Sequence, residues 1–276
     1  MPIPLAGNPL DWHLGDFVYP DSILSHAKGA LLPFFTTEDA IVLRQLCREF
    51  KDAVTEHKWR DEETKIKSRV GSWRACFPAA EAANVSGEYK FIGKVTDEDF
   101  RHFVGLKCLD MSFCGKVTDA AFVHLKGIHT LNMYYCNQTT ITDAAFVNLK
   151  GIHTLDMSYC KQPTITDAAF VYLKGIHTLN MSWCHQPTVT DAAFANLKGI
   201  HTLDMSECSQ PTITDAAFVN LKGIHTLNMM VCSQPTITDG AFVYLKGIHT
   251  LNMSYCNQPT ITDAAFVHLR GTRITR

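Results

Sequence analysis

Apolar residues recur with a fixed period along the last two-thirds of this chain. Each repeating unit contains a cysteine, and successive cysteines are separated by 22 residues once and then by 24 residues five times. In residues 149–174 the apolar positions are Leu149, Ile152, Leu155, Met157, Cys160, Ile165 and Phe170. A fixed period of this length is typical of a solenoid, in which each small unit buries its apolar face only against its neighbours. The sequence therefore predicts a core that is stretched along an axis.

One part of the unit reads as a strand. Residues 155–158 alternate between apolar and polar side chains, and this period of two predicts a short β-strand. Leu155 and Met157 would point inward, into the core. Asp156 and Ser158 would point outward, so the outward side of the strand would be polar.

The next part of the unit reads as a short helix over residues 167–174. Thr166 can cap its first turn with the hydroxyl, and Asp167 lies where the helix dipole favours an anion. Lys174 lies where the dipole favours a cation, and Gly175 can adopt the left-handed conformation that ends a helix. The boundaries of both elements are thus marked in the sequence.

The pattern L-x-x-I-x-x-L-x-M-x-x-C followed by I-T-D resembles leucine-rich repeats of the cysteine-containing type. The I/V-T-D segment that would open each helix begins at Val95, Val117, Ile141, Ile165, Val189, Ile213, Ile237 and Ile261. The resemblance covers residues 91–276 as about eight units of 22–24 residues. It implies an α/β solenoid, a right-handed superhelix with a parallel sheet on the concave face and short helices on the convex face.

Identical cysteines form one column of the repeats. They are Cys114, Cys136, Cys160, Cys184, Cys208, Cys232 and Cys256. Thiolates bind zinc and iron–sulfur clusters, but a closed zinc site needs short C-x-x-C loops, and the sequence has none. A small inward group also fits the turn after each strand. We therefore predict buried thiols, no metal and no cofactor.

Identical histidines form a second column, just before each predicted strand. They are His129, His153, His177, His201, His225 and His249. Stacked imidazoles could bind a metal ion or titrate near their ordinary pKa. Tandem copies also share residues simply because they share an origin, so both interpretations stay open.

The repeats differ mainly at the residue before the cysteine. This column reads Phe113, Tyr135, Tyr159, Trp183, Glu207, Val231 and Tyr255. Because the inward Cys160 follows Tyr159, the alternation must end at Ser158, which places the column at the rim of the concave face. Aromatic side chains are enriched anchors of protein interfaces.

We therefore predict a partner-binding site in this column, together with two residues of the outward polar column. Its residues are Phe113, Tyr135, Tyr159, Trp183, Glu207, Tyr255, Asp156 and Asp204. One alternative is that the rings pack across adjacent strands and only shield the ladder. The polar column could likewise only satisfy its own hydrogen bonds.

Residues 1–90 lack the period and predict a separate helical domain. Apolar residues at helical spacing predict one amphipathic helix over residues 36–54. Thr36 and Asp39 have the spacing of a capping box at its start.

The run from Leu31 to Val54 resembles the later half of an F-box. Its matching positions are Glu38, Asp39, Leu46, Cys47, Arg48 and Phe50, with Tyr19-Pro20 and Ile23-Leu24 in place of the opening. The resemblance implies docking on a Skp-family adaptor through Pro20, Ile23, Leu24, Leu31, Pro33 and Phe34. The alternative is that this region forms only the helical cap that a solenoid needs over its first edge.

An F-box followed by cysteine-containing repeats resembles the substrate receptors of cullin-based (SCF) ubiquitin ligases. The resemblance implies a non-catalytic adaptor that holds a protein substrate on its repeats. The rival interpretation is a structural or scaffolding repeat protein without a link to ubiquitin, for example a component of a larger assembly or of a virus particle.

Net charge, composition and the absence of known motifs exclude several classes of partner and function. A formal net charge of −2 argues against nucleic acid or an anionic membrane as the main partner. No run approaches the roughly 20 apolar residues of a membrane helix, and the N-terminus lacks the basic region of a secretory signal. Phosphate-binding loops and catalytic motifs are missing, so we expect neither an enzyme nor a small-molecule substrate. Ten cysteines suit a reducing compartment, the cytoplasm or the nucleus.

Overall fold

The computed structural model describes residues 31–46, 48–87 and 94–276. The chain divides into two compact units, residues 1–57 and residues 58–276.

The smaller unit contains η2 (Leu32–Phe34, a 3₁₀ helix), α2 (Thr37–Leu43) and α3 (Arg48–Glu56). The capping box is confirmed, because the Asp39 amide donates to the Thr36 hydroxyl while the Thr36 amide donates to the Asp39 carboxylate. The prediction of one helix over residues 36–54 was wrong. After Leu43 the backbone amides of Gln45 and Leu46 bond three residues back rather than four, and this tighter turn separates α2 from α3.

The larger unit contains a sheet of nine parallel strands in chain order, counted over the described residues. The strands are β1 (Ala82–Asn84), β2 (Cys108–Asp110), β3 (Thr130–Asn132), β4 (Thr154–Asp156), β5 (Thr178–Asn180), β6 (Thr202–Asp204), β7 (Thr226–Asn228), β8 (Thr250–Asn252) and β9 (Arg273–Thr275). Equivalent residues pair, so Leu155 lies between Leu131 and Leu179. Strand β1 lies upstream of residue 91, so the sheet begins earlier than the repeat pattern predicts.

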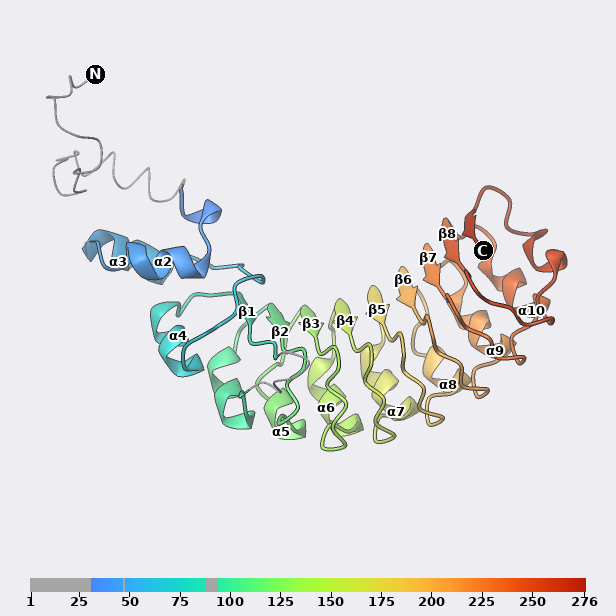
Figure 1. Ribbon diagram of the computed structural model, residues 1–276, viewed down its shortest axis with the longest axis horizontal. Helices are drawn as coiled ribbons and strands as arrows, with labels where there is room; N and C mark the ends of the chain where they lie inside the picture. The colour runs from blue at the N-terminus through green and yellow to red at the C-terminus, as the bar shows by residue number, and fades with distance from the viewer. Residues whose placement is uncertain (1–30, 47, 88–93) are drawn as a thin grey trace, which may run out of the picture. The chain divides into compact units, whose positions relative to one another are not determined.

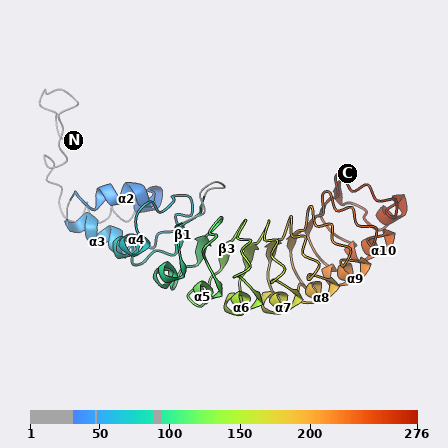
Figure 2. The same cartoon turned by 60° about the horizontal axis from the view of Figure 1, so that its bottom comes forward.

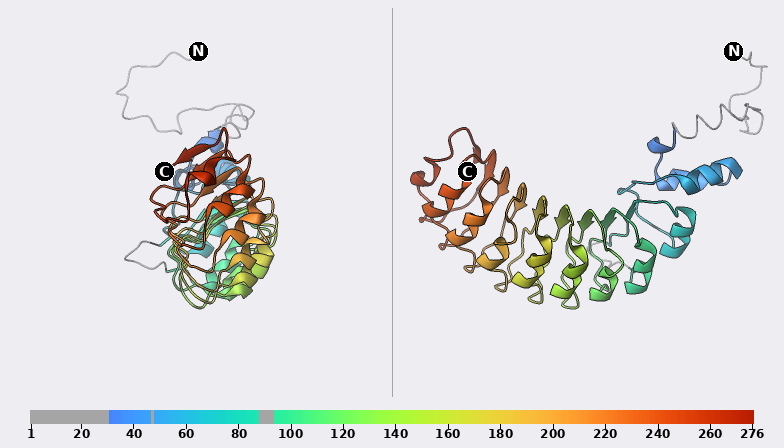
Figure 3. Two further views of the ribbon diagram at one scale, coloured as in Figure 1. Left: turned by 90° about the vertical axis from the view of Figure 1, so that its right-hand side faces the viewer. Right: turned by 180° about the vertical axis from the view of Figure 1, so that it is seen from behind.

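Short helices cover the other side of the sheet. They are α4 (Val70–Cys76), η3 (Asp97–Phe103), α5 (Asp119–Phe122), α6 (Asp143–Phe146), η4 (Val147–Leu149), α7 (Asp167–Phe170), η5 (Val171–Leu173), α8 (Asp191–Phe194), α9 (Asp215–Phe218), η6 (Val219–Leu221), α10 (Asp239–Phe242), η7 (Val243–Leu245) and η8 (Asp263–Phe266). Within this unit the strands line the inner, concave side and the helices the outer, convex side (Figures 1 and 2; Figure 3 gives the view from behind). The predicted α/β solenoid is confirmed.

Two local signals of the predicted helix over residues 167–174 act as expected, whereas Lys174 falls outside the helices, since α7 ends at Phe170 and η5 at Leu173. The Thr166 hydroxyl accepts a hydrogen bond from the Ala168 amide at 3.2 Å, which satisfies a backbone donor of α7. Gly175 has φ of +86°, the left-handed conformation that glycine adopts without steric cost. The chain can therefore turn from each helix directly into the next strand.

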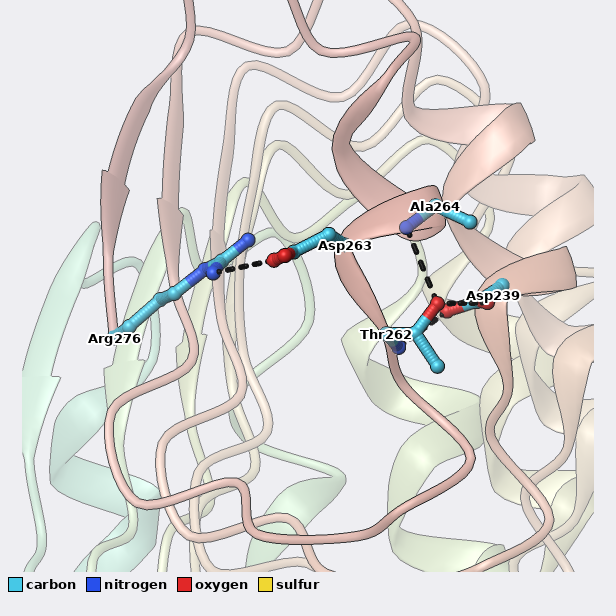
Figure 4. Close-up of polar contacts among 5 residues, drawn as sticks. All are labelled: Asp239, Thr262, Asp263, Ala264 and Arg276. Carbon is cyan, nitrogen blue, oxygen red and sulfur yellow. Dashed lines mark hydrogen bonds and ion pairs between the residues drawn. The ribbon is translucent and has the colours of Figure 1, made fainter.

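Side chains also connect each helix start to the next repeat. The Asp239 carboxylate accepts hydrogen bonds from the Thr262 amide at 2.6 Å and the Thr262 hydroxyl at 2.7 Å (Figure 4). The same hydroxyl accepts from the Ala264 amide, so one threonine serves both repeats. The hydrogen bonds from Thr262 lower the pKa of Asp239. Asp263 makes its contact with Arg276, whose guanidinium lies 3.1 Å away.

The core consists of the inward apolar residues predicted from the pattern. Leu155, Met157, Cys160 and Phe170 are completely buried. Ser158, expected on the exposed side, is also buried, and its hydroxyl donates to the Asp156 carboxylate. The period of two therefore fails at its last polar position, because a residue whose polar group is satisfied locally can be covered.

Candidate functional site

A strained turn follows each strand from β2 to β8. The Cys136 amide donates to the Met133 carbonyl at 3.1 Å, which closes a tight turn with Tyr135 as its third residue. That residue has a positive φ in every one of these repeats, between 58° and 60°, at Phe113, Tyr135, Tyr159, Trp183, Glu207, Val231 and Tyr255. The position favours Gly or Asn, and other residues lose about 1–2 kcal/mol there. The left-handed turn ends the alternation and lets the half-buried Tyr135 precede a completely buried Cys136.

Five aromatic rings from four repeats form one continuous group, which we call the aromatic cluster. The ring centroids of Phe113 and Tyr135 are 5.2 Å apart, and those of Tyr135 and Tyr159 are 6.0 Å apart. Tyr159 and Trp183 stack at 5.0 Å with their planes 19° apart. Tyr134 packs edge-on against Phe113 and Tyr159, at 5.1 and 5.3 Å. Each of the five side chains remains partly exposed.

Sequence reasoning missed Tyr134. The signal was present, because Tyr134 occupies the position at which the neighbouring repeats carry Ser112 and Ser158. Those serines are buried, whereas Tyr134 is half-exposed and adds a second ring from the same repeat. The repeat that contains β3 therefore contributes two rings to the cluster, and each of the other three repeats contributes one.

Charged and titratable groups border the cluster at Trp183. The Lys161 ammonium lies 5.2 Å from the Tyr159 ring centroid and 5.1 Å from that of Trp183, within the range of a cation–π interaction. The His185 ring packs edge-on against Trp183 at 5.7 Å. Burial, and secondarily the nearby Lys161, lower the pKa of His185, while Glu207 opposes that shift. The site therefore combines an apolar centre with a polar border.

Two other residues that were predicted to bind a partner form hydrogen bonds between neighbouring strands. Asp156 accepts a hydrogen bond from the Asn180 side chain at 3.0 Å, and Asp204 accepts one from Asn228 at 2.7 Å. Both remain half-exposed on the concave side. Their hydrogen bonds therefore run along the ladder, and a role in binding a partner stays a prediction.

Tyr255 lies apart from the aromatic cluster. It follows Trp183 by three repeats, and the intervening positions carry Glu207 and Val231. Its side chain is 71% exposed, and among the described residues no aromatic ring contact joins it to the cluster. The structure thus brings together four of the predicted column residues and leaves Tyr255 separate.

The predicted adaptor-binding residues fall in the smaller unit. Pro20, Ile23 and Leu24 lie outside the described residues. Leu31 is 50% exposed and Phe34 is 85% exposed, and Pro33 between them is exposed as well. Leu32, by contrast, is buried. The described part of this set therefore presents apolar side chains at a surface.

The cysteine column consists mainly of buried thiols with raised pKa values. The Cys160 thiol donates to the Met133 carbonyl at 3.2 Å, and its pKa is raised well above the ordinary value by burial. Burial raises the pKa of Cys184 to about 12. Neutral, buried thiols are poor nucleophiles and poor metal ligands. Within the described residues no group of three His, Cys, Asp or Glu side chains is arranged to hold a metal ion.

Comparisons with known proteins show the fold. No family model matches the chain, and no curated protein sequence matches it. A TLR13–ssRNA13 complex is similar with a TM-score of 0.60 and 19% identity, over 84% of this chain and 34% of that chain. Internalin C2 from Listeria monocytogenes is similar with a TM-score of 0.52 and 18% identity, over 73% of this chain and 83% of that chain.

The fold class follows from the likeness and the geometry together. The chain spans about a third of the length of the TLR13 chain that it matches. At such identities the likeness establishes the fold alone, which is that of a leucine-rich repeat solenoid. No helix within the described ranges combines the length and the apolar character needed to cross a membrane.

Proposed function

We propose that this leucine-rich repeat protein is a non-catalytic adaptor that binds another protein on its concave face. The observation that supports it is the placement of the aromatic cluster on strained turns. A residue such as Trp183, with φ of +60°, costs stability at a position where Gly or Asn would be relaxed. Large, half-exposed rings at such a position are explained if they anchor a partner.

The opposing interpretation is that the rings only shield the sheet. Contact between Tyr159 and Trp183 does recover part of the cost, because aromatic pairs contribute about 0.5–1.5 kcal/mol beyond their burial. Shielding alone would not need the Lys161 ammonium or the imidazole of His185 around the rings. An apolar centre with a polar border is the usual anatomy of an interface.

We further propose that the adaptor is the substrate-recognition subunit of an SCF-type ubiquitin ligase. The smaller unit would dock on a Skp-family adaptor. The exposure of Leu31, Pro33 and Phe34 supports this assignment, since three neighbouring apolar residues are available to a partner. The remaining proposed docking residues are Pro20, Ile23 and Leu24.

The docking step can be tested by co-expression with a Skp-family adaptor, followed by size-exclusion chromatography. The wild type is expected to elute as a one-to-one complex, and Pro33→Ala combined with Phe34→Ala is expected to elute alone. Lys51→Ala, an exposed change in α3 outside the docking set, is the matched control. A folded wild type that elutes without any adaptor of its host would refute the ubiquitin link and leave the smaller unit as a cap.

The concave face is tested separately with Tyr159→Ala combined with Trp183→Ala. Hot-spot aromatic residues contribute about 2 kcal/mol or more each, so the affinity for a bound protein should fall by two orders of magnitude or more. Val171→Ala, exposed on the convex side, should leave the affinity unchanged. An unchanged affinity in the folded double variant would show that the rings are shielding.

A further inference from the structure

The starts of the strands, at the side of the concave sheet opposite the aromatic cluster, carry different side chains. The segment Lys-Gly-Ile-His-Thr occurs six times, immediately before or within the start of β3 to β8: residues 126–130, 150–154, 174–178, 198–202, 222–226 and 246–250. In each copy the lysine is exposed and the histidine is exposed or half-exposed. The segments contain no Asp or Glu. We call these six lysines and six histidines the cationic strip.

The six imidazoles of the strip are stacked. Neighbouring ring centroids lie 4.5 or 4.6 Å apart, and the planes of neighbouring rings differ by 10–19°. In the first five copies the Nδ1 atom lies 3.1–3.3 Å from the hydroxyl of the threonine that follows. The rings are therefore held in one common orientation by their own strands.

This orientation argues against chelation of a metal ion by the strip. The lone pair of an imidazole nitrogen lies in the ring plane, so the lone pairs of parallel, stacked rings point in the same direction and do not converge on one ion. Protonation is the remaining chemistry of such a row. A proton added to one imidazole places a positive charge about 4.5 Å from each neighbouring ring.

Adjacent imidazolium charges repel each other. At His225, burial and secondarily the neighbouring His201 and His249 lower the pKa. An anion lying along the row would offset that repulsion and favour protonation. Binding of an anion and uptake of protons are therefore coupled.

We propose that the cationic strip binds an extended acidic segment of a partner protein and takes up protons as it does so. Five steps of about 4.5 Å make the row of rings roughly 23 Å long, and an extended chain advances about 3.3 Å per residue, so about seven residues would follow it. Six lysine ammonium groups give the strip its positive charge, and each protonated imidazole adds to it.

Carboxylates at the far ends of the strands restrict the ligand to the strand starts. Asp110, Asp156 and Asp204 lie farther along β2, β4 and β6 and repel an anion that spreads across the sheet. Lys107, immediately before β2, extends the row of positive charges by one strand. Its ammonium lies 3.5 Å from the Gly127 carbonyl. Other charged groups near the two ends are Glu62 and Glu81, the latter paired with Lys58 and Arg60, and Arg273.

An acidic protein segment fits the strip better than a nucleic acid does. Single-stranded nucleic acids bind where aromatic residues stack on their bases beside a basic groove, and in these segments the only rings are the histidines, which already stack on each other. The whole chain is also slightly acidic, with a formal net charge of −2. The inference rests on the proposed function only in taking the ligand to be a protein.

The test uses a fluorescently labelled octaglutamate peptide and the full-length protein, in EDTA, with fluorescence anisotropy at about pH 7.5 and about pH 5.5. Any protonation of the peptide in acid would remove negative charge and weaken binding, so tighter binding at the lower pH reports on the protein. We expect the affinity to rise about tenfold in mild acid. His177→Gln combined with His201→Gln should reduce this rise, and Lys174→Gln combined with Lys198→Gln should weaken binding at both pH values.

His268→Gln and Lys116→Gln are the matched controls, because both residues are exposed and lie outside the strip. They should bind the peptide like the wild type. An affinity that does not change with pH, or that the strip variants leave intact while circular dichroism shows them folded, would overturn the proposal. Tighter binding of an oligothymidylate with the same number of charges would assign the strip to nucleic acid instead. None of these results depends on the aromatic cluster or on adaptor docking. A failure of this proposal can therefore be distinguished from a failure of the proposed function.

Discussion

Replacing Glu207 by glycine should stabilise the protein, although glycine usually destabilises. Glu207 has φ of +60°, and relief of the left-handed conformation is worth about 1–2 kcal/mol. Glycine costs about 0.5–1 kcal/mol through the greater entropy of the unfolded chain. Glu207 makes no aromatic contact within the described residues, so little packing is lost. The net gain in free energy of unfolding should be about 0.5–1 kcal/mol.

Ser209→Gly, two residues along the same turn region, is the control. Ser209 is exposed and does not have a positive φ, so it should lose only the entropic term, about 0.5–1 kcal/mol. The two variants should differ by about 1–2 kcal/mol, since the entropic term is common to both. Urea unfolding followed by circular dichroism, with equal slopes, measures this difference. Equal destabilisation by both changes would refute the argument that these turns are strained.

Further predictions concern the framework of the repeats. Thr190→Val should lower the free energy of unfolding by about 2 kcal/mol, because it removes a helix cap and a charge-assisted hydrogen bond, whereas Thr190→Ser should stay near the wild type in urea titrations. Phe170→Ala should cost about 3–5 kcal/mol in the same assay, because the completely buried ring leaves a cavity. Cys160 should resist a thiol reagent in the native state and react only after denaturation, since burial raises its pKa. Because the pKa of Asp239 is lowered on folding, its hydrogen bonds from Thr262 stabilise the protein above the unfolded pKa and are lost as pH falls through the folded pKa. The difference in unfolding midpoint between the wild type and Asp239→Asn should therefore shrink in acid, and a constant difference would contradict this assignment.

The sequence was sufficient to predict the repeat framework, because each boundary depends on local chemistry. Thr166 caps its helix and Gly175 is left-handed, as their residue types favour. Leu155 and Met157 are buried because a period of two leaves them no other side. Tandem copies then fix the stacking, since each unit can only bury its apolar face against an equivalent one.

The remaining features depend on contacts between repeats, which no single unit encodes. The stacking of Tyr159 on Trp183 arises from residues 24 positions apart that the ladder brings side by side. The common orientation of the imidazoles likewise requires the parallel register of the strands. The break after Leu43 was missed for a different reason, because apolar spacing in residues 36–54 suits one helix or two shorter ones equally well.

The variable column is also the place where the fold is least sensitive to side-chain identity. Phe113, Trp183, Glu207 and Val231 differ in size, polarity and branching, yet their φ angles agree within 2°. The turn is thus imposed by the hydrogen bond that closes it and by the buried cysteine that follows, not by the residue that occupies it. Because the backbone holds each residue in the same conformation, a substitution in this column changes the exposed surface without moving the strands. A repeat protein built in this way can acquire a new binding surface while its core stays the same, which is the property that the proposed adaptor function requires.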